Sequence, residues 1–164
     1  MRRALTISRL AAAVFACGIL TAAQPPSVPL PDPRLTPEEV VGVVLEALRA
    51  NDRPTPGHGI AVTFAFSSPA NREATGPLER FTALVQSERY RPMLNHRSVE
   101  RGVVKILGNE ARERVVLTGE DGTRAAYVFT LSRQGAGPYK DCWMTDGVVR
   151  EASTAALRGV LATE

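Results

Sequence analysis

The β-rich segments in the second half of the chain follow one another with very short connections. Four such segments span residues 98–107, 111–118, 123–133 and 139–149, and the connections GNE, GEDG and QGAGP between them all contain glycine. Parallel neighbours need a crossover of about a dozen residues or more, whereas antiparallel neighbours need only a tight turn. The spacing therefore predicts an antiparallel meander of four strands.

The first half of the chain has the period of helices. Residues 36–52 place apolar side chains at the spacing of one helix face, and Thr36 with Glu39 forms a capping box at the start. A second helix is expected within residues 60–68, ended by Pro69, although a short apolar run fits a strand as well. A third is expected from Gly76, opened by Pro77. Its expected buried stripe consists of Leu78, Phe81, Leu84 and Val85.

Helices followed by strands predict an α+β fold in which the N-terminal helices pack on one face of a curved four-stranded antiparallel meander. Residues 35–150 form the single domain of this prediction, and residues 151–164 form a C-terminal tail with a weak helical pattern.

The N-terminus has the pattern of a secretory signal. MRRALTISR is basic, residues 10–23 are uncharged and too short to span a bilayer, and small residues stand at the expected cleavage position after Ala23. Residues 24–34 then form a Pro-rich linker. The pattern predicts export to the periplasm or the outside of the cell, with no membrane span in the mature chain. Two alternatives share these residues: lipid anchoring at Cys17 and targeting to an organelle.

The charge pattern argues against a nucleic-acid partner. Removing residues 1–23 takes away three arginines and lowers the formal charge from +3 to 0, and the remaining basic and acidic residues are interspersed. A basic stripe for nucleic acid or anionic lipid is therefore absent from the sequence. His58, His96 and Cys142 lie at no recognised zinc spacing, so neither a metal nor a cofactor is expected.

The candidates for chemistry are few. His96 precedes a strand and could act in proton transfer with Asp146, Asp141 or the phenol of Tyr127 if the fold brought them together. The alternative is that His96 caps a turn and Asp146 forms the turn before Gly147.

Three further polar residues, Ser67, Ser68 and Arg72, also have two interpretations. A serine hydroxyl before Pro69 is expected to cap the segment PANREAT rather than act as a nucleophile. Arg72 fits either a carboxylate ligand or neighbouring loop carbonyls.

The stretch YKDCWMTDGVV favours structure over catalysis. In an extended strand, Cys142 and Met144 face one way while Tyr139, Trp143 and Thr145 face the other. Trp143 is expected to pack over the helices. Cys142 is expected to be a buried small hydrophobe, with an intermolecular bridge or a reactive thiol as alternatives.

Three stretches carry a resemblance to known domains: FAFSSPANREATGP (64–77), the following LERFTALV, and WMTDGVV (143–149). Together they resemble an uncharacterised family of small, mostly bacterial domains of unknown function, over about Leu35 to Arg150. The order of elements is also similar to nuclear transport factor 2-like, or cystatin-like, cone domains. That resemblance implies a curved sheet wrapped around helices with an apolar pocket, and it fixes no function.

The leading functional hypothesis is a non-enzymatic domain that binds a small apolar or amphipathic molecule in the mouth of the cone. The aromatic side chains expected along or beneath this pocket are Phe64, Phe81, Tyr127 and Trp143. One alternative is a homodimer or envelope interaction module that uses the outer face of the sheet. The other is a small isomerase or hydro-lyase with His96 or Asp146 as its base.

Overall fold

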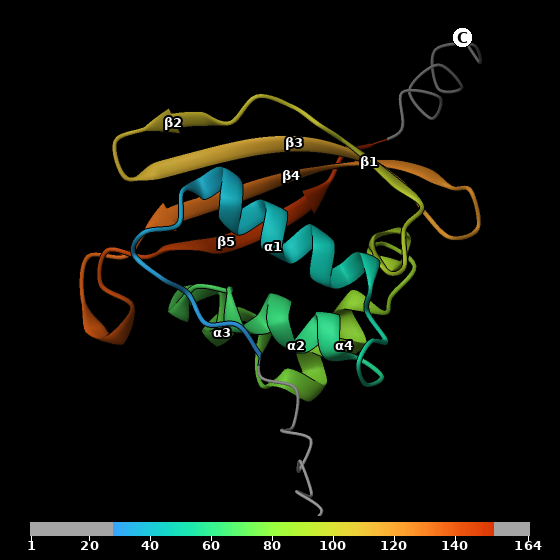
Figure 1. The fold of residues 1–164 in the computed structure, drawn as a ribbon, viewed down its shortest axis with the longest axis horizontal. Helices are drawn as coiled ribbons and strands as arrows, with labels where there is room; N and C mark the ends of the chain where they lie inside the picture. Colours follow the sequence, from blue (N-terminus) through green and yellow to red (C-terminus); the bar gives the residue numbers. More distant parts are fainter. Residues whose placement is uncertain (1–27, 153–164) are drawn as a thin grey trace, which may run out of the picture.

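The structure is a computed structural model, and it describes residues 28–152. Helices cover one face of an antiparallel sheet, as Figure 1 shows, so the fold class is α+β. The expected signal segment, the Cys17 alternative and residues 153–164 of the expected tail lie outside the described residues.

Helix α1 (Pro37–Arg49) begins where the sequence predicted. The Thr36 hydroxyl accepts from the Glu39 amide at 3.2 Å, and a Glu39 carboxylate oxygen accepts from the Thr36 amide at 2.7 Å, which confirms the capping box. The helix buries one apolar face against the sheet. Its buried aliphatic residues are Val40, Val41, Val44, Leu45 and Leu48.

Helix α2 (His58–Ala65) begins against the end of α1. Its first turn has no side-chain cap from its own N-cap residue, and Asn51 takes that role: its carbonyl accepts from the Gly59 amide at 3.0 Å and its side-chain oxygen from the Ile60 amide at 3.1 Å. The two helices cross so closely that a Cβ on Gly59 would lie 2.1 Å from the carbonyl oxygen of Ala47. Only glycine fits this crossing.

The chain then forms two short helices, α3 (Pro69–Thr75) and α4 (Leu78–Val85). The helix expected within residues 60–68 and ended by Pro69 ends earlier, at Ala65. Pro69 is instead the first residue of α3, and the Ser68 side chain caps that helix. In α4 the expected stripe is only half buried: Phe81 and Val85 are buried, whereas Leu78 and Leu84 are exposed. Sequence periodicity located the face of α4 but not how much of it the other helices cover.

The sheet has five strands, not four. They are β1 (Ser98–Arg101), β2 (Lys105–Leu107), β3 (Glu110–Thr118), β4 (Arg124–Arg133) and β5 (Trp143–Arg150). The strand order is β1-β3-β4-β5, β2 also pairs with β3, and all pairs are antiparallel. The strand expected over 139–149 begins only at Trp143, because Tyr139 belongs to a 3-10 turn over Gly137–Tyr139.

The extra strand arises because the segment expected over 98–107 is interrupted at Gly102. Three residues, 102–104, face only residues 113–114 of β3, so the register shifts by one between β1 and β2. A Cβ on Gly102 would lie 2.8 Å from the carbonyl oxygen of Arg114, which shows how close the two backbones are. The interruption depends on this contact with β3, and the glycine inside an otherwise β-rich run was its one local signal.

A buried carboxylate lies next to this interruption. Glu113 is fully buried on the helix-facing side of β3 and forms a bidentate ion pair with Arg101, at 2.6 and 2.7 Å. Arg101 also donates to the carbonyl of Glu38 at 2.7 Å and passes over Gly42 of α1. This ion pair therefore joins the first half of α1 to β1 and β3.

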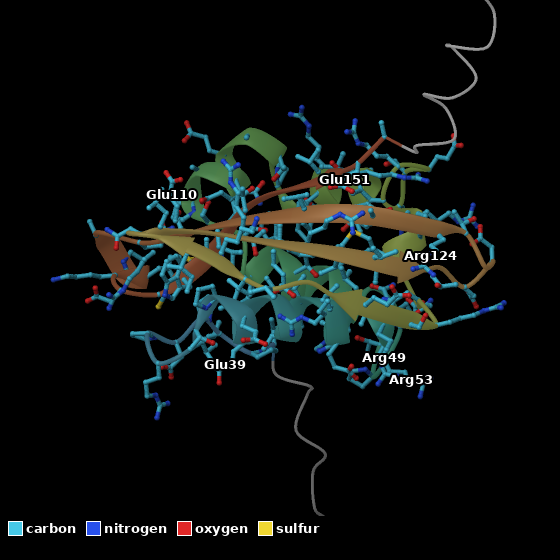
Figure 2. The ribbon with its side chains drawn as sticks, turned by 90° about the horizontal axis from the view of Figure 1, so that it is seen from above. Glu39, Arg49, Arg53, Glu110, Arg124 and Glu151 are labelled. Atoms are coloured by element: carbon cyan, nitrogen blue, oxygen red, sulfur yellow. The ribbon has the colours of Figure 1, made fainter. Side chains whose placement is uncertain are left out.

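The two faces and the two edges of the sheet differ. Charged side chains lie over the outer face, where Arg124 pairs with Glu100 and Arg114 with Glu151 (Figure 2). At the β2 edge, Val103 and Leu107 are 85% and 83% exposed.

Within residues 28–152, no helix combines the length and the apolar character needed to cross a membrane.

Candidate functional site

A cavity of about 250 Å³ lies between the four helices and β5. Aliphatic and aromatic side chains form most of its wall: Val44, Leu48, Phe81, Leu84, Val85, Tyr90, Met93, Val148 and Val149. A larger groove of about 740 Å³ lies near Arg91, Asp121 and Arg150, and its lining is mixed in charge and polar. We treat the smaller cavity as the candidate site because small-molecule sites are mostly apolar with a few polar groups.

The wall on the β5 side is closed by the connection between α2 and α3. The amide of Thr145 donates to the carbonyl of Phe66 at 2.9 Å, and the amide of Ser68 donates to the carbonyl of Thr145 at 2.8 Å. The Asn71 side chain donates to the same Thr145 carbonyl at 3.1 Å. Residues 66–68 therefore pair with the edge of β5 and hold the helices against it.

A β-bulge at Asp146 sets which β5 side chains face the cavity. Thr145 is opposite Leu131 and Gly147 is opposite Thr130, so Asp146 has no partner in β4. The extra residue lets Thr145 and Val148 both face the helices, although they are three positions apart. Without the bulge, strict alternation would turn one of them to the outer face.

The polar groups of the wall differ in how they are satisfied. The Thr63 hydroxyl donates to the carbonyl of Gly59 at 2.8 Å, and the Ser67 hydroxyl donates to the carbonyl of Thr63 at 3.0 Å. The Thr145 side chain is buried, and its Oγ1 has no hydrogen-bond partner among residues 28–152. Thr145 thus provides a hydroxyl group that the protein itself does not use.

Of the four aromatic residues predicted for the pocket, Phe81 lines the cavity. Phe64 packs behind it, with ring centroids 5.2 Å apart. Tyr127 is fully buried elsewhere in the core: burial raises the pKa of its phenol to about 12, and the phenol donates to the carbonyl of Arg89 at 2.9 Å. Trp143 is partly buried and packs against the core, away from the cavity wall.

Sequence reasoning missed Tyr90 and Thr145 as wall residues. Tyr90 follows α4 in an irregular segment, and its phenol donates to the carbonyl of Val148 at 3.0 Å. The sequence pattern puts Thr145 on the same face as Trp143. Its contact with the segment between α2 and α3 depends on pairing with Ser67, which is far away in the sequence. The neighbouring Asp-Gly pair was the one local signal, since it suggested an irregularity at this point of β5.

The two weak catalytic candidates do not meet. His96 is buried on the helix side, where its Nδ1–H donates to the carbonyl of Met93 at 2.9 Å, and it does not line the cavity. Burial lowers the pKa of His96, partly opposed by the hydrogen bond to Met93. Asp146 is exposed at the bulge and accepts from the Ser132 hydroxyl at 2.9 Å.

The contacts of Arg72 and the burial of Cys142 indicate that both residues stabilise the fold. Arg72 donates to the carbonyls of Phe64 and Ala65 at the end of α2, and its guanidinium lies over the rings of Phe64 and Tyr139 at 5.3 and 5.1 Å. Of its two interpretations, the structure therefore favours binding of backbone carbonyls. The Cys142 thiol is buried, and burial raises its pKa.

Residues 28–152 contain no group of three or more His, Cys, Asp or Glu side chains placed to hold a metal ion.

Comparison with curated proteins and with solved structures gave no match for this chain. Residues 33–155 match the family model described as Domain of unknown function (DUF4864).

Proposed function

The chain belongs to the family described as Domain of unknown function (DUF4864), and from the geometry of its cavity we propose that it binds a small apolar or amphipathic molecule without changing it chemically. One observation carries the proposal: a mostly apolar cavity between the helices and β5, with an unused hydroxyl in its wall. Small-molecule sites are concave and mostly apolar with a few polar groups, so a cavity with this lining is a candidate for an occupant.

The volume limits the size of that occupant. The cavity measures about 250 Å³. One water molecule takes roughly 30 Å³ in the liquid, and the same volume for each non-hydrogen atom of a ligand gives room for about eight such atoms. For comparison, an engineered apolar cavity of roughly 150 Å³ in another protein binds benzene. A short chain or a single ring fits, whereas a whole lipid does not.

The exposed members of the wall extend the apolar surface outward. Leu84 lines the cavity and is 40% exposed. Val149 also borders the cavity, but its position opposite Val128 directs its side chain to the outer face of the sheet. Apolar side chains at an opening let a longer molecule leave its polar end in water while its apolar end is buried. This arrangement supports the amphipathic form of the proposal.

The expected affinity is modest. At about −0.5 kcal/mol per non-hydrogen atom, within the range known for small ligands, eight atoms give about −4 kcal/mol and a Kd of about 1 mM. Methyl NMR detects binding in this range. Titration with toluene is expected to shift the methyl signals of Val44, Val85 and Val148, which line the cavity.

A cavity-filling variant tests whether the shifts come from this site. Val85→Phe places a ring in the cavity and should abolish the shifts. Val116→Phe, on the outer face of β3 where the side chain is partly exposed, should leave them unchanged. Toluene shifts that persist in a folded Val85→Phe protein would place the binding elsewhere and refute the proposal.

The finer description of the fold is also a proposal. The order of helices before a meander, the helices on one face and the bulge in β5 support a nuclear transport factor 2-like cone. An experimental structure in which the sheet is flat rather than curved around α1 would contradict it.

Export likewise stays a prediction, and the mass of the mature chain from its host tests cleavage after Ala23.

The homodimer is a second candidate, favoured by the apolar residues of the β2 edge rather than by the outer sheet face. Ile106 and Leu107 of β2 and Val103 just before it are exposed, and β2 pairs with β3 on one side only. Edge strands of this kind pair readily with another chain. Sedimentation velocity at increasing concentration tests it: a dimer that Ile106→Lys abolishes would support it, and a monomer throughout would exclude it.

A further inference from the structure

The Thr145 hydroxyl is the starting point for the chemical class of the ligand. Thr145 lines the cavity and is 2% exposed, and its Oγ1 has no hydrogen-bond partner among the described residues. Buried polar atoms are nearly always paired, since an unpaired one loses its hydrogen bonds to water without replacement. A bound molecule with an oxygen atom would supply the missing partner.

The neighbouring polar groups define what that oxygen can do. The hydroxyl hydrogens of Thr63, Ser67 and Thr75 are all donated to backbone carbonyls, and the Asn71 amide donates to the carbonyl of Thr145. Their oxygens keep lone pairs that can accept. Thr145 is therefore the one hydroxyl of the described cavity wall that is free to donate, and a ligand oxygen would accept from it.

The cavity wall also excludes a charged ligand group. Its lining contains no Asp, Glu, His, Lys or Arg side chain, and the one phenol, that of Tyr90, donates to the carbonyl of Val148. A carboxylate or an ammonium group placed inside would lose its water without gaining a counter-charge, which is strongly unfavourable. The buried part of the ligand is therefore neutral.

We propose that the cavity binds the apolar part of a neutral, oxygen-bearing molecule, an alcohol or a carbonyl compound, whose oxygen accepts a hydrogen bond from the Thr145 hydroxyl. This inference rests on the proposed binding function and adds the ligand class to it. An alcohol fits best, because its own hydrogen can be donated to a lone pair of the Ser67 or Thr63 hydroxyl.

Three probes of similar size test the inference on the full chain: toluene, benzyl alcohol and benzoate, each titrated by methyl NMR. Benzyl alcohol should bind at least as tightly as toluene, and benzoate at least tenfold more weakly. Thr145→Val keeps the shape of the side chain and removes the hydroxyl, so it should weaken benzyl alcohol about tenfold while leaving toluene within about twofold. Thr145→Ser keeps the hydroxyl and should preserve the wild-type preference.

The outcomes separate this inference from the binding function. If toluene binds at the cavity and Thr145→Val changes both probes equally, the binding function stands and the role of Thr145 is refuted. If benzoate binds as tightly as benzyl alcohol and Thr145→Val weakens both by the same factor, a carboxylate accepts from Thr145 inside the cavity and the neutral class is refuted. If none of the probes binds at the cavity, the binding function fails, and this inference fails with it. Should Thr145→Val not fold, Thr145→Ala gives the same comparison of benzyl alcohol with toluene.

Discussion

Replacing Gly59 with alanine is expected to destabilise the domain far more than a single methyl group normally does. The added Cβ would lie 2.1 Å from the Ala47 oxygen and 2.7 Å from its carbonyl carbon. A carbon and an oxygen in contact are normally about 3.3 Å apart, so α1 and α2 must separate by about 1 Å.

That separation affects the hydrogen bonds that join the two helices. The amide of Gly59 is 3.0 Å from the carbonyl of Asn51, and the amide of Ile60 is 3.1 Å from its side-chain oxygen. A further 1 Å takes both distances to about 4 Å, beyond hydrogen-bond range. Two lost hydrogen bonds at about 1 kcal/mol each, with about 1–3 kcal/mol for overpacking, give a loss of about 3–5 kcal/mol.

Urea unfolding measures this loss directly, with far-UV circular dichroism and the fluorescence of Trp143 as two probes of the same transition. Gly57→Ala is the matched control: Gly57 has φ +74° but nothing within 4 Å of an added Cβ. It should cost only about 1–2 kcal/mol, for the left-handed backbone alone. If Gly59→Ala costs no more than Gly57→Ala, α1 and α2 can separate freely and the account of their crossing is refuted.

Three further predictions concern buried polar groups. Because burial lowers the pKa of His96 in the folded state, the unfolded state takes up the proton first, so stability should fall as pH drops below about 6.5, by at most about 1.4 kcal/mol per pH unit. His96→Gln should flatten that part of the pH profile. Arg101→Met should cost about 3–5 kcal/mol, because it leaves the buried Glu113 carboxylate unpaired, and adding Glu113→Leu should recover much of the loss. Arg72→Met should cost about 1–3 kcal/mol, because the carbonyls of Phe64 and Ala65 lose their donor.

Each of these predictions has a contrary result. A pH profile of stability below 6.5 that is identical in wild type and His96→Gln would mean that His96 takes up a proton as readily in the folded state as in the unfolded state. A double variant of Arg101 and Glu113 that is as unstable as Arg101→Met alone would contradict the unpaired-charge explanation. A stability of Arg72→Met equal to that of wild type would show that water replaces the guanidinium at the end of α2.

The parts of the fold that depend on neighbouring residues were predictable from the sequence. The capping box of Thr36 and Glu39 and the apolar face of α1 are encoded within a few positions, and both are confirmed. The short Gly-containing connections predicted antiparallel pairing, which is also confirmed. The division of residues 98–107 into two strands was predictable only in part: Gly102 inside the run signals a close backbone approach, but the sequence does not show that its partner is Arg114 of β3.

The candidate site was less predictable than the fold. Large aromatic residues line most pockets, yet burial in the core is equally favourable for them, as Tyr127 shows, so their presence in the sequence does not locate the cavity. The cavity depends instead on Thr145, whose position follows from the bulge at Asp146 and from pairing with residues 66–68. The Asp-Gly pair signals the bulge locally, but the pairing with residues 66–68 leaves no pattern in the local sequence.

The two edges of the sheet have different consequences for assembly. Residues 66–68 cover part of the β5 edge, whereas β2, at the opposite edge of the described domain, pairs with β3 on one side only. Strand addition at the β2 edge would use the open side of β2 in both copies and so give a pair. At the β5 edge, the pairing of residues 66–68 with Thr145 would interfere with strand addition, which disfavours growth into a fibre.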